Sequence, residues 1–158
     1  MIRTAILTIS DSCSKGQRED ISGQAISDIL KENNYGVSEK RIVADDQEKI
    51  TTELICLSDV AKVDVVFTTG GTGFGPRDVT PEATIAVCEK IVPGLGELMR
   101  LKGLEKTPNA ILSRSTAGIR KNTLIINLPG SPKAVRECLG TILNILPHAV
   151  KMMHGGGH

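Results

Sequence analysis

The sequence is poor in aromatic residues and in net charge, and both shortages limit the partners it can have. It contains one Tyr, two Phe and no Trp, and its 19 basic residues are balanced by 18 acidic ones, for a net charge of +1. Single-stranded bases bind by stacking on aromatic side chains, and duplex phosphates bind to basic surfaces. We therefore expect no nucleic-acid partner.

Long apolar runs and paired cysteines are also missing. No run approaches the roughly 20 apolar residues that span a bilayer, and the apolar start at residues 2–9 leads into polar and acidic residues rather than a cleavage site. The cysteines form no C-x-x-C pair, and the three histidines complete no zinc-site spacing. These absences predict a soluble, cytoplasmic protein with no membrane partner. The thiols expected to be buried and free are those of Cys13, Cys56, Cys88 and Cys138.

Strand patterns alternate with helical ones along the chain. Apolar, β-rich runs predict buried strands at residues 3–10 and 63–69, and a more polar run at 37–44 predicts a strand near a sheet edge. Residues 117–120 and 123–128 are expected to form a hairpin through Lys121 and Asn122.

Helical periodicity fills the intervals between these strands. The first two expected helices cover residues 21–30, with an end marked by Gly36, and residues 50–61. A third begins with Thr80 as N-cap and Pro81 at its first position, and a fourth follows a break at Pro93-Gly94 and continues to about residue 102. The last covers residues 132–146 and is extended or kinked after Pro147. Strands separated by helices predict an α/β sandwich with a mainly parallel sheet. We expect one domain over residues 1–154 and a frayed tail over 155–158.

Two glycine-containing loops follow strong strand candidates. The first, residues 69–81, reads TGGTGFGPRDVTP, and its glycines let main-chain N–H groups approach an anion closely. The second, residues 127–133, reads NLPGSPK and again joins a strand to a helix that starts with proline. Ligands of open α/β sheets bind beyond the carboxyl ends of the strands. The two loops therefore predict an anion site at this edge, although each loop taken alone could be no more than a sharp turn.

Neither loop is a common nucleotide-binding motif. A P-loop requires Gly-Lys-Ser/Thr, but no lysine follows Gly73 or Gly75. A dinucleotide fingerprint requires a third glycine where this chain has Pro76. These mismatches disfavour a nucleotide-dependent oxidoreductase, which is one alternative reading.

The residues of both loops resemble a known family. TTGGTGFGPRDVTPEAT at 68–84 and LIINLPGSPKAV at 124–135 are similar to the molybdopterin-binding family of molybdenum-cofactor biosynthesis, and within it most similar to the adenylyltransferase branch that includes the G domain of gephyrin. ILTISDSCSKG at 6–16, DISG at 20–23 and the segment 107–130 extend the resemblance over nearly the whole chain. The resemblance implies a three-layer α/β/α sandwich, the molybdopterin-binding fold, assembled as a homotrimer.

The resemblance also implies an activity. Members of this branch transfer AMP from ATP to the terminal phosphate of molybdopterin with Mg²⁺, release pyrophosphate, and pass the product to a separate molybdenum insertase. The second alternative reading is a module on the same fold that binds molybdopterin, or helps assembly, without catalysis.

Site residues are carried over from the resemblance position by position. The two key carboxylates, which would also hold Mg²⁺, fall on Asp45 and Asp78, with Asp46 as a competitor for the first role. For Asp78 the alternative is a cap or loop hydrogen bond before the following helix. Gly103 stands where relatives often carry Ser, so a hydroxyl contact is lost there. The substrate contacts fall on Ser14, Gly70, Gly71, Thr72, Gly73, Ser113, Asn127, Pro129 and Gly130.

Overall fold

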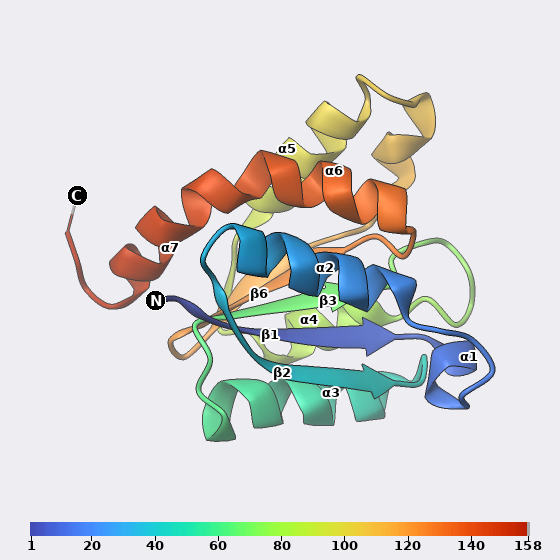
Figure 1. Cartoon of the computed structure of the whole chain (residues 1–158), viewed down its shortest axis with the longest axis horizontal. Coiled ribbons are helices and arrows are strands. Elements are labelled where there is room, and N and C mark those ends of the chain that lie inside the picture. The colour runs from blue at the N-terminus through green and yellow to red at the C-terminus, as the bar shows by residue number, and fades with distance from the viewer. Residues whose placement is uncertain (158) are drawn as a thin grey trace.

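A mixed sheet of six strands lies at the centre of the molecule (Figure 1), and this computed structural model describes residues 1–157. The strand order is β2-β1-β3-β6-β5-β4. The first four strands in this order are parallel, whereas β5 runs antiparallel to both β6 and β4. The prediction of a mainly parallel sheet is confirmed. The strands are β1 Arg3–Ile9, β2 Gly36–Val43, β3 Val65–Thr69, β4 Lys90–Ile91, β5 Ala117–Arg120 and β6 Thr123–Leu128.

Helices cover both faces of the sheet and make it the middle of three layers (Figure 1). Side chains alternate between the two faces of a strand, so Ile6 and Phe67 pack with α2, α5, α6 and α7, whereas Leu7 and Val66 pack with α3 and α4 on the opposite face. The three-layer sandwich is therefore confirmed. The α-helices are α1 Asp11–Ser14, α2 Ile21–Glu32, α3 Gln47–Ile55, α4 Thr80–Val87, α5 Pro93–Gly103, α6 Pro132–Ile142 and α7 Leu146–Met153.

The edge strand and the hairpin follow the sequence predictions, but one short strand was missed. β2 lies at one edge of the sheet, and β5 pairs with β6 through a turn in which Lys121 has a φ of 52°. β4 at the opposite edge has only two residues, both exposed. A strand that short has no periodicity for the sequence to reveal.

Two predicted helix boundaries are wrong in detail. Asn34, with a φ of 63°, follows the end of α2, whereas Gly36 is already the first residue of β2. Asparagine adopts this left-handed conformation more readily than most residues because its side chain can hydrogen-bond locally. The helix expected at residues 50–61 starts earlier, at Gln47, and its last turn is a π-helix, η1, over Cys56–Val60.

The long C-terminal helix is interrupted before Pro147 rather than after it. A short 3-10 helix, η3 at Leu143–Ile145, separates α6 from α7. Proline lacks an N–H, and its ring clashes with the carbonyl four residues earlier, here that of Leu143.

Two of the glycines after α7 are hydrogen-bonded to the helix. The N–H groups of Gly155 and Gly156 donate to the carbonyls of Met152 and Lys151, and Gly155 has a φ of 80°. This arrangement is a Schellman cap. The last residue of the predicted tail, His158, lies outside the described residues.

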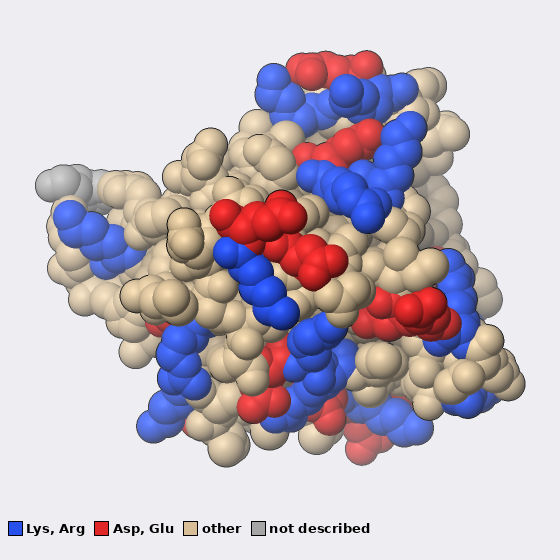
Figure 2. Space-filling model, viewed as in Figure 1, with Lys and Arg blue, Asp and Glu red and all other residues tan. Residues whose placement is uncertain are grey.

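The four cysteines are free and only partly buried. Burial raises the pKa of Cys88 and of Cys138 to about 11. Within residues 1–157, every helix is too short or too polar to cross a bilayer. Figure 2 shows acidic and basic side chains interspersed on one face of the molecule, as the balanced composition would suggest.

Candidate active site

The carboxyl ends of β1, β2, β3 and β6 meet at one edge of the sheet, and the two predicted loops start there. Gly70 and Gly71 follow β3 with φ angles of 97° and 70°, which side chains other than glycine rarely adopt. A Cβ atom on Gly70 would lie 2.3 Å from the carbonyl oxygen of Ile9. A Cβ on Gly130 would lie 3.6 Å from Gly70 Cα, so the second loop packs directly against the first.

Thr80 holds the start of the glycine-rich loop and does not cap helix α4. Its Oγ1 donates to the carbonyl of Gly70 at 2.8 Å, and its N–H donates to the carbonyl of Gly71 at 3.1 Å. Val79 occupies the N-cap position without a side-chain hydrogen bond, which corrects the predicted cap. Pro81 lies in the first turn as predicted. The threonine hydroxyl is therefore used to tie the loop to the helix that follows it.

Two cavities flank the glycine loops. The larger, of about 630 Å³, is lined by Thr72, Gly73 and Pro129 together with residues of α5 and α6. The smaller, of about 420 Å³, is lined by Gly70, Gly71 and Gly130 together with residues that follow β1 and β2. Each loop therefore presents successive residues to the two cavities, and the loops form the boundary between them.

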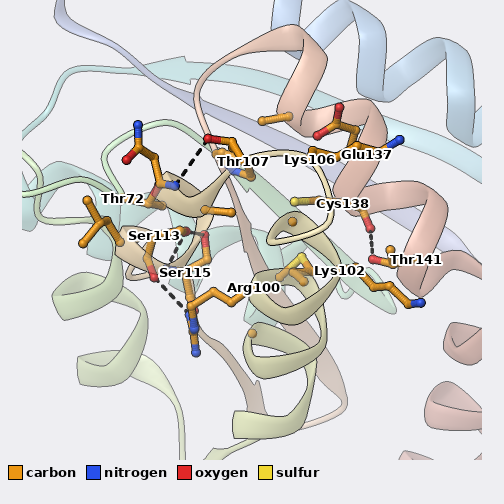
Figure 3. A pocket seen from close by; sticks show the side chains of 18 of the residues that line it. Thr72, Arg100, Lys102, Lys106, Thr107, Ser113, Ser115, Glu137, Cys138 and Thr141 are labelled. Carbon is orange, nitrogen blue, oxygen red and sulfur yellow. Dashed lines mark hydrogen bonds between the residues drawn. The ribbon is translucent and has the colours of Figure 1, made fainter.

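The larger cavity lies between α5 and α6, and its lining includes basic residues together with the acidic Glu105 and Glu137. Figure 3 shows Glu137 and three of the basic side chains. Arg100 donates to the carbonyls of Ser113 and Ser115. Cys138 and Thr141 lie on the opposite side of the cavity in α6 (Figure 3). The other cationic side chains that line it are those of Lys102, Lys106 and Arg136.

Gly103, where the family resemblance led us to expect the loss of a serine hydroxyl, also lines the larger cavity. A Cβ there would lie 2.6 Å from the Cβ of Ala110. Alanine at 110 therefore leaves no room for a serine at 103 unless the backbone moves. α5 therefore packs closely at Gly103 against the 3-10 helix η2, Pro108–Leu112.

The smaller cavity is polar and contains two helix N-termini. Asp20 caps α2, accepting from Gly23 N–H at 2.8 Å and from the Thr8 hydroxyl at 2.6 Å. Ser131 caps α6 by accepting from the N–H of Ala134. The hydroxyl of Ser22 donates to the carbonyl of Gly130 and links α2 to the second loop. Helix N-termini favour negative charge, and the carboxylate of Asp20 already supplies it at α2. The N-terminus of α6, capped by the neutral Ser131, and the cation Arg18 are the features here that favour an anion. The lining also includes the acidic residues Glu19, Asp20 and Asp45.

Asp45 lines the smaller cavity and is paired with Asp11. The N–H of Asp11 donates to Asp45 Oδ2 at 2.8 Å, and the N–H of Asp45 donates to Asp11 Oδ1 at 3.1 Å. Burial raises the pKa of Asp45, and the nearby charges of Asp11 and Asp78 raise it further against the effect of the Asp11 hydrogen bond. Asp46 instead caps α3 by accepting from Lys49 N–H. The structure thus gives the two neighbouring aspartates different surroundings.

Arg77 joins the glycine-rich loop to this pair of aspartates. Its guanidinium donates to both carboxylate oxygens of Asp11, at 3.0 and 2.8 Å. This fork lowers the pKa of Asp11. The loop that contains Asp78 is therefore connected, through Arg77 and Asp11, to the segment that contains Asp45.

Asp78 lies over the glycines of its own loop. Its Oδ2 accepts from the N–H of Gly75 at 2.8 Å, which is the loop hydrogen bond considered as the structural alternative. A Cβ on Gly73 or Gly75 would lie 2.9 Å from the same oxygen. These glycines leave room for the carboxylate. Asp78 itself lines neither of the two cavities.

Of the remaining residues predicted to contact substrate, some line a cavity and others support the fold around it. Ser113 lines the larger cavity. Ser14 is exposed at the end of α1, where its hydroxyl donates to the carbonyl of Asp11. Asn127 is fully buried, and its amide donates to the hydroxyls of Thr68 and Thr84. Asn127 therefore touches neither cavity and joins β6 to β3 and α4.

Several residues that shape the site were not singled out from the sequence. Asp11 lies two residues after the end of β1, so the strand-end argument applied to the other loops would have found it. Asp20 and Ser22 lie in the DISG segment that carried part of the resemblance. Arg114 had no local signal, because its partners lie more than thirty residues away in the chain.

Fold and site together define an α/β sandwich protein with paired glycine loops for anions at the carboxyl edge of its sheet. The model of a family described as a probable molybdopterin binding domain matches residues 5–148. The chain belongs to this family.

Individual relatives agree with the family assignment. A molybdopterin adenylyltransferase of Helicobacter pylori strain J99 is 49% identical, over 98% of this chain and 89% of the relative. Gephyrin of Dictyostelium discoideum is 41% identical over 94% of this chain and 22% of its own length. Among solved structures, the molybdopterin biosynthesis enzyme MoaB of Thermus thermophilus superposes with a TM-score of 0.92, at 47% identity and 98% coverage of both chains.

Proposed function

We propose that this protein is an enzyme that transfers AMP from ATP to the terminal phosphate of molybdopterin and releases pyrophosphate. A relative 49% identical over nearly the whole chain is named molybdopterin adenylyltransferase, which supports the activity. Both substrates carry phosphate groups, and the site is built from anion-binding elements. The proposal therefore agrees with the family and with the chemistry of the site.

The observation that carries the proposal is the pair of cavities divided by the glycine loops. A two-substrate transfer requires two binding spaces whose reacting ends meet at one place. Gly70 and Gly71 face the smaller cavity, and Thr72 and Gly73 face the larger one. Phosphates that enter from both cavities would meet at the main-chain N–H groups of this loop.

The reaction needs no activated side-chain nucleophile. A phosphate oxygen of molybdopterin is already anionic at neutral pH and attacks the α-phosphorus of ATP. A bond from this oxygen to phosphorus forms while the bond from the α-phosphorus to pyrophosphate breaks, and pyrophosphate leaves with the electron pair. The protein must hold two anions in line and offset their charge, so positioning and electrostatics supply the catalysis.

In this proposal Asp45 and Asp78 are the residues that would hold a magnesium ion. Magnesium prefers oxygen ligands, and one or two carboxylates with substrate phosphates and water suffice. Each carboxylate has one oxygen, Oδ1, without a hydrogen bond to any residue in 1–157. When bound, Mg²⁺ would offset negative charge on the phosphates. Asp45 and Asp78 would hold and orient it, and the Asp11 N–H would fix the direction of the Asp45 carboxylate.

The proposal extends to assembly and cellular context. By resemblance to the family, we propose a cytoplasmic homotrimer that delivers its product to a separate molybdenum insertase. Measurement of the mass in solution by light scattering tests the assembly. A species three times the chain mass of 16.9 kDa is expected, and a monomer at micromolar concentration would contradict it.

Incubation of the purified protein with molybdopterin, ATP and Mg²⁺ tests the function. Adenylylated molybdopterin, detected by mass spectrometry, is the expected product. Tight binding of molybdopterin without this product would identify a non-catalytic binding or assembly module. Failure to bind molybdopterin would remove the proposal altogether.

A further inference from the structure

Arg114, which lies outside the glycine-rich loop, donates three hydrogen bonds to it. Its Nε donates to the carbonyl of Gly73 at 2.8 Å, and its Nη2 donates to the carbonyl of Asp78 at 2.8 Å. Its main-chain N–H donates to the carbonyl of Thr72 at 3.0 Å. One residue therefore holds both ends of the segment that contains Asp78.

Glu82 fixes the guanidinium that makes these contacts. It lies in the first turn of α4 and forms an ion pair with Arg114 Nη1. The hydrogen bond from Arg114 lowers the pKa of Glu82, so this carboxylate stays ionised at neutral pH. The planar guanidinium can reach two carbonyls and a carboxylate at once, which a lysine ammonium on a flexible stem cannot do with the same geometry.

The segment that Arg114 holds, residues 73–78, has few other interactions that would fix its position. Residues 74–77 are exposed, and Gly73 and Gly75 add backbone freedom. Among the described residues, the other hydrogen-bonded tie from residues 73–78 to the rest of the protein is the fork from Arg77 to Asp11. Without Arg114, the carboxylate of Asp78 and the loop amides would sample many positions.

We infer that Arg114 is a positioning residue, which sets the glycine-rich loop and the Asp78 carboxylate in the geometry that adenylyl transfer requires. The inference deepens the proposed function and rests on it. Arg114 lines neither cavity, so it acts through the loop and not by contact with either substrate. Its loss should therefore lower kcat more than it raises the KM of either substrate.

Arg120, at the end of strand β5, provides a matched control for Arg114, which precedes the same strand. Its guanidinium also combines a carboxylate, that of Asp59, with a main-chain carbonyl, that of Val87. It lies where β5 turns into β6, at the end of β6 opposite to the glycine loops. Arg120→Lys should lower stability as Arg114→Lys does, but it should leave kcat, KM and the loop unchanged.

The experiment combines kinetics with hydrogen exchange of the loop amides in wild type, Arg114→Lys and Arg120→Lys. In Arg114→Lys we expect kcat to fall about tenfold or more, on the scale of a misplaced catalytic group, with KM changed by less than about twofold. The amides of Gly75, Asp78 and Thr80 should exchange faster, because local opening of the loop becomes easier. Arg120→Lys should match wild type in both measurements.

Two results would overturn the inference: unchanged loop exchange in Arg114→Lys, or faster exchange with an unchanged kcat. If Arg114→Lys does not fold, Glu82→Gln keeps the arginine but removes its anchor, and the same loop amides should exchange faster than in wild type. If wild type makes no adenylylated molybdopterin, the proposed function fails. Loop exchange, which needs no substrate, would still show whether Arg114 holds the segment.

Discussion

At the scale of single residues, Asp45 and Asp46 show where sequence reasoning stops. Both follow β2, and the resemblance left either one able to fill the first carboxylate role. The strand-end rule places a residue near an edge to within a position or two, but it does not say which of two neighbours turns inward. In the structure Asp45 faces the smaller cavity, and Asp46 caps α3.

Replacement of Asp78 tests the second carboxylate. Asp78→Asn should lower adenylyl transfer by about 100-fold, the scale for loss of one electrostatic element in an active site. Folding should survive, because an asparagine oxygen can still accept from the N–H of Gly75. Steady-state kinetics and thermal melting check both parts, with Asp28→Asn on the exposed face of α2 as the control. Wild-type turnover in folded Asp78→Asn would remove this residue from the mechanism.

The raised pKa of Asp45 gives a prediction about stability and pH. Because the folded state binds this proton more tightly than the unfolded state does, the group favours folding at low pH, and this contribution is lost as pH rises through the folded-state pKa. The ionised carboxylate therefore destabilises the substrate-free protein at pH 7. Asp45→Asn should melt at a higher temperature than wild type at pH 7, and the gain should shrink toward pH 4.

Asp46→Asn serves as the control for this measurement, since asparagine also caps helices well and no gain at pH 7 is expected. A melting temperature for Asp45→Asn at or below that of wild type at pH 7 would mean that the buried charge carries no cost.

At the scale of elements, strands and helices were largely predictable, whereas their junctions were not. Apolar runs and helical periodicity located β1, β3, β6 and the main helices, because burial of one face or both determines those patterns. The end of α2 at Asn34 and the use of Thr80 as a loop tie depend on contacts with other segments. The role of Arg114 could not be predicted, because it binds the main-chain carbonyls of Gly73 and Asp78, and every residue has such a carbonyl.

The junction of β3 and α4 requires glycine at 71 for structural reasons as well as for binding. A Cβ there would lie 2.2 Å from Thr80 Oγ1, and the φ of 70° is unfavourable for alanine. Gly71→Ala should therefore destabilise the protein by about 1–3 kcal/mol, the cost of a strained backbone position. Glycine at 71 therefore has a structural role beside the substrate contact that the resemblance implies.

A double-mutant cycle separates the two causes. Thr80→Ala removes the hydroxyl that the new methyl group would strike, so Gly71→Ala should cost less in the Thr80→Ala background than in wild type. Urea unfolding of the four proteins measures this coupling. Strict additivity would show that the backbone angle alone excludes alanine at this position.

At the scale of the whole molecule, the sheet brings residues from distant parts of the chain to one edge. Asp45, Gly70 and Gly130 all line the smaller cavity, although they follow three different strands. The rule that parallel strands end together predicted that the two glycine loops would meet, whereas Asp45 was assigned from the resemblance. It could not predict that the loops divide two cavities, because that division depends on how α5 and α6 pack above them.

The most direct test of the account follows pyrophosphate release from ATP with and without molybdopterin. We predict one pyrophosphate for each molybdopterin adenylylated and no release when molybdopterin is omitted, because its phosphate is the nucleophile. Release should stop with a chelator and return with Mg²⁺, and Ca²⁺, which tolerates looser geometry, should restore it poorly. Pyrophosphate release without molybdopterin, or release of inorganic phosphate in its place, would contradict transfer of AMP between substrates held on the two sides of the glycine loops.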